Sequence, residues 1–348
     1  MCKIPIFKNN AIKTAVQISA SLLTVAAITT FCISSAINNN SVYMQYDTTI
    51  DSVANRHNIR VDELAANNEL IGTPSYYIDQ TIGSFEREES SVLEETNSGF
   101  EITILDVGQG ECCLIKCDGH YLLFDGGDRD TSSFVYSYMQ NTEHIKEFDY
   151  VIASHYDSDH ISGLIGIVKK FPCKSIFGAP YIGDTSTYNS FIEACGKNCG
   201  LTYPNVGDVF TLGSSLCQVV SPVGNSYDDE NGYSLGIRVL YGSTSFLIMG
   251  DATKESELDS LSAGLLAKTN VLVVNHHGSA SSTADEFIAT VMPDAAVISV
   301  GANNEFGHPT TEVLSKLSNI PVYRTDEFGT ITFISDGEHI DIYTERTY

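Results

Sequence analysis

Four side chains that commonly bind metal ions lie within a stretch of six residues: His155, Asp157, Asp159 and His160. They follow the apolar segment Tyr150–Ala153, which has the composition of a buried strand. In a tight loop after a strand, the first two side chains can point to one side, while the last two open the next helix and point at a second metal ion. Two ions a few ångströms apart can share a hydroxide that attacks a phosphorus or carbonyl centre. The spacing predicts a two-metal hydrolytic site, with Asp159 placed to orient or deprotonate the attacking water.

Other candidate ligands also lie at the ends of predicted strands. Asp251 follows the apolar segment 245–249, and from that position its carboxylate can bridge two ions. His276 and His277 follow the apolar segment 271–274. One of them is expected to bind the second metal ion and the other to orient ligands or substrate. The sequence does not distinguish the two.

His308 stands between Gly307 and Pro309, two residues that fix the course of its loop. We predict that its imidazole contacts the substrate or the leaving group as a catalytic residue. The alternative is a structural role, in which His308 caps the helix expected to start at Thr310.

The elements that position these side chains belong to the segment from Phe100 to the end of the chain. Short β-branched runs separated by glycine turns alternate there with helical segments, which is typical of an α/β fold. Helices are expected at 133–141, 161–170, 255–267 and 310–317. About 250 residues without a second linker indicate one domain, 100–348, compatible with two similar halves.

The ligand segment 155–160 resembles the signature of the metallo-β-lactamase superfamily, in the variant whose second histidine is aspartate. That variant is characteristic of the hydrolase domain of the DNA-uptake competence protein ComEC and its relatives. Further motifs of this family occur in the same order: Asp106-Val107-Gly108-Gln109-Gly110, Asp125-Gly126-Gly127, Gly250-Asp251, His276-His277-Gly278-Ser279, Gly307-His308-Pro309 and Tyr323-Arg324-Thr325-Asp326. The resemblance covers residues 100–345 and implies an αββα sandwich. It also implies that Asp125 braces the ligand loop.

Compared with the wider superfamily, the first metal site has few imidazoles. Asp157 stands in place of a histidine. No histidine lies between residues 161 and 275, so the third imidazole ligand that usually completes the first metal site is absent. The first ion would be held by His155, Asp157 and the bridging Asp251, with Asn231, Ser234 or water completing the site. Because oxygen ligands favour harder ions, we expect two divalent ions, zinc or manganese, with magnesium as a further candidate.

Residues 1–36 are expected to form a signal peptide or a membrane anchor. Three lysines precede the segment 14–46, which contains no charged side chain, and small residues occupy positions 34–36. The apolar part is about as long as a bilayer requires, so its length does not separate a cleaved signal from a retained anchor. We favour cleavage and a secreted or cell-surface protein, with membrane anchoring as the alternative.

Residues 43–82 show the order strand, helix, helix, strand. The phrase Val61-Asp62-Glu63-Leu64 before two asparagines resembles a LysM module, although Tyr46-Asp47 stands where that family usually has Gly-Asp. The resemblance implies a small βααβ module that binds peptidoglycan, and a helical spacer is the alternative. Residues 83–99 carry five glutamates and almost nothing apolar, so we predict an acidic linker.

The nine cysteines are scattered along the chain, although export would permit disulfides. Cys112, Cys113 and Cys117 are expected to be small core residues. Cys195 and Cys199 are the best candidates for a disulfide or a metal pair.

The net charge of −25 bears on the substrate. Such a surface repels polyanions, whereas tight DNA binding normally comes from lysine and arginine contacts to phosphates. The ComEC resemblance nonetheless implies a phosphodiesterase acting on nucleic acid, and this is the function that we predict. The alternatives are an esterase for a wall-linked phosphodiester of the teichoic-acid type and a non-catalytic wall-binding protein. The retained ligands Asp159, His160 and Asp251 argue against the last.

Overall fold

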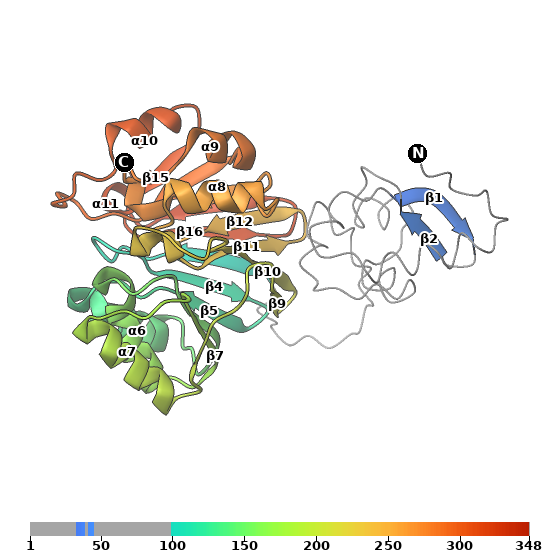
Figure 1. Ribbon diagram of the computed structural model, residues 1–348. Helices are drawn as coiled ribbons and strands as arrows, with labels where there is room; N and C mark the ends of the chain where they lie inside the picture. The colour runs from blue at the N-terminus through green and yellow to red at the C-terminus, as the bar shows by residue number, and fades with distance from the viewer. Residues whose placement is uncertain (1–32, 39–40, 45–98, 348) are drawn as a thin grey trace. The chain divides into compact units, whose positions relative to one another are not determined.

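The structure is a computed structural model that describes residues 33–38, 41–44 and 99–347 (Figure 1). The chain divides into two units, residues 1–88 and 89–348. In the first unit, β1 (Ile33–Asn38) and β2 (Ser41–Met44) pair antiparallel. Apart from these strands and Gly99, the predicted signal segment 1–36, the predicted LysM-like module 43–82 and the predicted acidic linker 83–99 lie outside the described residues. In the described part of the chain, no helix is long and apolar enough to cross a membrane.

Two mixed sheets form the centre of the second unit within residues 99–347. The larger sheet has the strand order β17-β16-β3-β4-β5-β6-β7-β8, and the smaller has the order β15-β14-β13-β12-β11-β10-β9. The larger sheet contains β3 (Phe100–Ile104), β4 (Cys113–Cys117), β5 (His120–Phe124), β6 (Phe148–Ala153), β7 (Cys173–Gly178), β8 (Leu201–Thr202), β16 (Ile331–Ser335) and β17 (Ile340–Thr344). The smaller contains β9 (Val209–Leu212), β10 (Ser215–Ser221), β11 (Gly236–Tyr241), β12 (Thr244–Ile248), β13 (Val271–Val273), β14 (Ala295–Ile298) and β15 (Val322–Arg324).

Helices cover the outer faces of both sheets, as Figure 1 shows for α6 and α7 on one side and α8, α9 and α10 on the other. The α-helices are α5 (Ser132–Ser137), α6 (Ser158–Lys170), α7 (Ser186–Lys197), α8 (Lys254–Ser262), α9 (Asp285–Val291), α10 (Thr311–Lys316) and α11 (Thr325–Phe328). Shorter helical turns are η2 (Arg129–Thr131), η3 (Tyr138–Thr142, a π-helix), η4 (Glu230–Tyr233) and η5 (Asn275–Gly278). This arrangement confirms the expected αββα sandwich.

Successive side chains of the central strands point alternately into two apolar cores, one between the sheets and one under the outer helices. In β12, Phe246 and Ile248 point between the sheets, where they meet Phe100 and Ile102 of β3, while Leu247 packs under the helices of the smaller sheet. This alternation follows from the two-residue period of a strand, and burying each large apolar side chain contributes about 1.5–3 kcal/mol. The central strand β12 is therefore buried on both of its faces.

Some element ends differ from the expectation. The helix predicted at 161–170 begins earlier, at Ser158, so Asp159 and His160 lie in its first turn. The helix predicted at 255–267 ends at Ser262, because Gly264 adopts a φ of 71° that stops the helix.

The seven cysteines within the described residues are free thiols. Cys112, Cys113 and Cys117 are buried in the core, as expected. Cys195 is buried while Cys199 is exposed, so the structure does not join this candidate pair.

Candidate metal centre

Four strands from the two sheets end at the same edge of the sandwich. The larger sheet contributes the parallel strands β5 and β6, and the smaller contributes the parallel strands β12 and β13. The residues that follow these strands include Asp125, His155, Asp251 and His277. Functional side chains gather at the carboxyl ends of parallel strands because the loops leave the sheet there. The fold thus brings together ligands that are far apart in the sequence.

The rings of His160 and His277 are held in defined orientations by hydrogen bonds from Nδ1. His160 Nδ1 lies 2.7 Å from Asp125 Oδ2, and His277 Nδ1 lies 2.8 Å from the carbonyl oxygen of Ser299. Since both partners are acceptors, each Nδ1 donates a proton to its partner, and each Nε2 is the ring nitrogen left to face a metal ion. This arrangement is common for histidines that bind metal ions.

The two free nitrogens converge on one point. His160 Nε2 and His277 Nε2 lie 3.2 Å apart, and Asp251 Oδ1 lies 3.3 Å from the first and 3.5 Å from the second. Asp159 Oδ2 completes the group, 3.6 Å from His277 Nε2 and 3.8 Å from His160 Nε2. Four electron-donor atoms facing one another are stabilised by a cation between them, so these residues fit a metal ion.

A second group of donor atoms meets the other oxygen of Asp251. Asp251 Oδ2 lies 4.0 Å from His155 Nε2 and 3.5 Å from His276 Nε2, and Asp157 Oδ2 lies 3.7 Å from His155 Nε2. His155 Nε2 and Asp251 Oδ1 are buried and have no hydrogen-bond partner. Buried polar atoms are rarely left unpaired without a functional reason. Asp251 therefore presents one oxygen to each group of donor atoms.

The carboxylates and the imidazoles of the cluster shift one another's pKa values toward the charged forms. Burial lowers the pKa of His160, but the carboxylates of Asp251, Asp125 and Asp159 outweigh it and hold this pKa well above its ordinary value. Burial raises the pKa of Asp251, while His277 and His160 hold it well below its ordinary value. The carboxylates thus favour a second proton on His160, and a divalent cation among the donor atoms would take the place of that proton.

Asp125 is fully buried and does brace the ligand loop. Its Oδ1 accepts from the backbone N–H of Ser154 at 2.8 Å, and its Oδ2 accepts from Ser154 Oγ at 2.6 Å and from His160 Nδ1. It therefore fixes the residue before His155 and the ring of His160 at the same time.

Backbone strain is concentrated at the same place. Asp125, His276 and His277 have φ values of 55°, 52° and 53°, a region that residues with a side chain rarely occupy. Such conformations cost of the order of 1–3 kcal/mol each and cluster at functional sites.

The glycines of the family motifs allow close backbone contacts at the site. A Cβ on Gly110 would collide with the backbone of Asp159, and one on Gly126 would collide with the backbone of Gly163 and Leu164. A larger residue at Gly110 would push the start of α6 away from the segment after β3, and one at Gly126 would push α6 away from the segment after β5.

His308 and Ser234 lie near the cluster, and each has a buried polar atom without a hydrogen-bond partner. The His308 ring contacts the His276 ring at a centroid distance of 5.6 Å, and its Nδ1 is buried without a partner. Ser234 lies beside Gly250, and its buried Oγ also lacks a partner. Asn231, the other residue considered for the first metal site, lies three positions earlier in η4.

Glu111, which was not predicted from the sequence, has its carboxyl group buried next to the cluster. It forms a compact group with Asp125 and His160, and its Oε1 has no partner. Burial and then the charge of Asp125 raise the pKa of Glu111 to about 8, so the group is largely protonated at neutral pH. The available signal was its position immediately after the motif 106–110.

Glu257 of α8 was also missed, and it holds the loop that carries His276 and His277. Its Oε1 accepts from Asn275 Nδ2 and from the N–H of Thr283, and its Oε2 accepts from the N–H of Ala284, all at 2.7 Å. Burial raises the pKa of Glu257 to about 7, against the effect of these three donors.

Glu257→Gln is expected to reduce the free energy of unfolding by about 1–3 kcal/mol, because the amide group places an N–H against a buried N–H of the loop. Urea unfolding followed by circular dichroism measures the change. The control is Glu255→Gln, an exposed residue two positions earlier that should change stability by less than about 0.5 kcal/mol. Equal effects of both variants would show that the buried contacts of Glu257 do not stabilise the loop.

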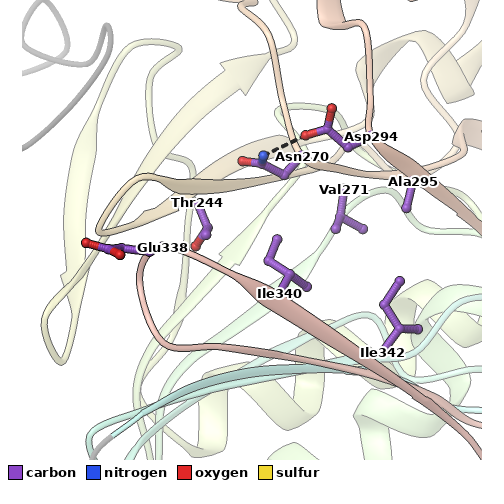
Figure 2. Close-up of a pocket in the computed structure, with 8 residues that line it drawn as sticks. All are labelled: Thr244, Asn270, Val271, Asp294, Ala295, Glu338, Ile340 and Ile342. Atoms are coloured by element: carbon purple, nitrogen blue, oxygen red, sulfur yellow. Dashed lines mark hydrogen bonds between the residues drawn. The ribbon is translucent and has the colours of Figure 1, made fainter.

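A pocket of about 240 Å³ lies elsewhere, at the amino-terminal ends of β13 and β14 (Figure 2). It is lined by Thr244, Asn270, Val271, Asp294, Ala295, Glu338, Ile340 and Ile342, and Asn270 Nδ2 donates to Asp294 Oδ2 at 2.7 Å. The metal-ligand candidates lie at the opposite ends of these strands. The pocket contains none of them and is separate from the site.

Comparison with known families decides the assignment. A profile of the metallo-beta-lactamase superfamily matches residues 105–302, more than half of the chain. The chain belongs to this superfamily. This confirms the family predicted from the ligand motifs, and the domain has the fold of metal-dependent hydrolases, with His and Asp groups suited to divalent ions.

Curated relatives include ComE operon protein 3 of Bacillus subtilis, 29% identical over 253 residues that cover 67% of this chain and 33% of that protein. Recombination protein 2 of Haemophilus influenzae is 31% identical over 223 residues, 63% of this chain and 26% of that protein. The chain thus spans about a third or less of the length of these relatives. Among solved structures, the metallo-beta-lactamase fold protein YhfI of Bacillus subtilis is 14% identical with a TM-score of 0.46, covering 68% of this chain and all of that one.

Proposed function

We propose that this metallo-beta-lactamase domain is a phosphodiesterase that acts on nucleic acid with two divalent metal ions. The observation that carries the proposal is the arrangement around Asp251, whose two oxygens face two separate groups of histidine and aspartate donors. The competence protein among the relatives, Competence protein ComA of Neisseria gonorrhoeae, supports a substrate related to nucleic acid; it is 29% identical over 235 residues, 67% of this chain and 32% of that protein.

The two groups define which residues would hold each ion. Asp159, His160 and His277 form the better-defined group, because both imidazoles are oriented by their Nδ1 hydrogen bonds. The other group consists of His155, Asp157 and His276. Asp251 belongs to both groups.

We propose His276 as a ligand of the first metal site, for which the sequence offered no third histidine. No histidine between residues 161 and 275 supplies a third imidazole to the first group, but His276 Nε2 faces the same Asp251 oxygen as His155 Nε2. We therefore assign His277 to the second metal site and His276 to the first, with zinc and manganese as the leading metals and magnesium as a further candidate.

Divalent ions bound here would supply a nucleophilic water at neutral pH and offset the negative charge that develops on the phosphate. Asp159 would orient that water, and the 26% exposure of its side chain supports this role. Burial, His276 and His277 lower the pKa of His308, so its neutral imidazole is available to hydrogen-bond the leaving group.

We further propose that the chain is exported and retained at the cell wall. The lysine-rich start, the uncharged segment 14–46 and the LysM-like pattern at 43–82 support this proposal. The LysM-like module would bind peptidoglycan, and a retained signal segment would instead place the protein at a membrane.

The substrate test is hydrolysis by the purified chain of a chromogenic phosphodiester, of single-stranded DNA and of a glycerol-phosphate polymer, each with zinc, manganese and magnesium. Metal-dependent cleavage of the chromogenic ester and of DNA is expected. Cleavage of the glycerol-phosphate polymer without cleavage of DNA would favour the wall-linked substrate. No turnover with any metal would contradict the enzymatic function and leave a wall-binding role.

A further inference from the structure

We propose that Phe306 is a stacking platform that gives this site its preference for substrates with a nucleobase. The inference rests on the proposed phosphodiesterase function and adds a specificity-determining residue to it. Phe306 lies in the loop between β14 and α10, and its side chain is 67% exposed. An exposed phenylalanine leaves most of its apolar area in water, where a planar ligand can cover it.

The ring lies next to the metal centre through two aromatic contacts. Phe306 stacks on His308, with ring centroids 5.7 Å apart and planes inclined by 25°. His308 in turn meets His276 edge to face, at 5.6 Å and 82°. His276 Nε2 lies 3.5 Å from Asp251 Oδ2. A phosphate bound beside Asp251 would therefore have one of its ester groups near the His308 and Phe306 rings.

Hydrogen bonds hold the loop in one conformation. Asn304 Nδ2 donates to the carbonyl oxygens of Gly301 at 3.0 Å and His308 at 2.6 Å, and Asn304 Oδ1 accepts from the N–H of His308 at 3.0 Å. The N–H of Thr310 donates to the carbonyl oxygen of Gly278 at 2.9 Å, which ties the loop to the turn bearing His276 and His277. The loop therefore holds the Phe306 ring in position before a ligand binds, so little conformational entropy of the loop is lost on binding.

The chemistry of the contact favours a base over a polyol. Every nucleobase has a π-face, and base–aromatic stacking is a general means of binding single strands. A glycerol-phosphate ester has no planar group to stack on Phe306. Stacking also needs no positive charge, so it suits a protein whose net charge is −25.

The test compares ligands with and without a base, using the full chain loaded with Mn²⁺. Phe306→Ala is expected to weaken binding of thymidine 5′-monophosphate, measured by calorimetry, by about 5- to 150-fold, which corresponds to the 1–3 kcal/mol of one stacked base. Binding of ribose 5-phosphate should not change. In Phe306→Ala, the KM for a thymidine dinucleotide should rise to a similar extent. The KM for the same diester without the base that stacks on Phe306 should not change. Phe306→Trp should restore both values.

The control is Ile182→Ala, which removes an apolar side chain that is 85% exposed in the loop between β7 and α7. It should change neither binding nor KM. If Phe306→Ala weakens both ligands equally, or neither, the stacking role is wrong. If the wild-type chain cleaves no phosphodiester, the proposed function fails, and the binding comparison still decides the role of Phe306.

Discussion

Asp251→Ala is expected to remove bound metal and to lower phosphodiesterase activity by more than about 100-fold, the upper end of the loss seen for residues that only support metal ligands. Both donor groups depend on this carboxylate, because its Oδ1 faces His160 and His277 while its Oδ2 faces His155 and His276. Metal content by mass spectrometry and hydrolysis of a chromogenic phosphodiester measure the two effects on the same sample.

The control for this variant is Asp294→Ala, which removes an exposed carboxylate beside the pocket at the other edge of the sheet (Figure 2). Metal content and activity should stay at the wild-type level. Circular dichroism should show that both variants are folded. Full metal content and activity in folded Asp251→Ala would contradict the bridging role.

Asp125→Ala is expected to reduce the free energy of unfolding by about 3–5 kcal/mol, the range found when one partner of a buried ionic contact is removed. The substitution leaves the N–H and Oγ of Ser154 and the Nδ1–H of His160 without an acceptor in a fully buried environment. Urea unfolding of the metal-free protein measures the loss, so the result does not depend on metal binding.

Asp149 provides a matched comparison. Its carboxylate also accepts three hydrogen bonds, from the Nδ1 of His120, the N–H of Tyr121 and the Nζ of Lys174, but the ring of His120 and the side chain of Lys174 are about half exposed. Asp149→Ala should cost only about 1 kcal/mol, because solvent replaces the lost contacts. Losses of the same size for both variants would contradict the view that burial makes Asp125 a brace.

The ligand loop could be predicted from sequence because its chemistry is local. The strand before His155 sets where the loop starts, and the spacing from Asp157 to His160 sets which side chains enter the next helix. Asp251 could be predicted from its position after an apolar strand. Its neighbours in space could not, since they depend on which strands lie side by side.

The assignment of His276 and His277 could not be made from sequence. Both residues follow the same strand, and both adopt a left-handed backbone that turns their rings toward different oxygens of Asp251. Which of the two binds a metal ion therefore stays a prediction, and the structure adds that each ring faces its own oxygen of Asp251.

The burial of Glu111 and Glu257 could not be predicted from the sequence. A charged residue is usually expected at the surface, and each of these is buried by segments distant in the chain. Glu257 finds two of its donors 26 and 27 positions away, at Thr283 and Ala284. Such burial follows from tertiary packing and has no local pattern.

The most direct test of the central claim is a metal titration of the chelator-treated chain, with activity followed at each addition of manganese or zinc. Two donor groups sharing Asp251 predict that metal-free protein is inactive and that activity returns as two ions bind per chain, while the double variant Asp159→Ala, Asp251→Ala neither binds them nor recovers. Full turnover after complete metal removal, or recovery in the double variant, would show that the chemistry takes place elsewhere.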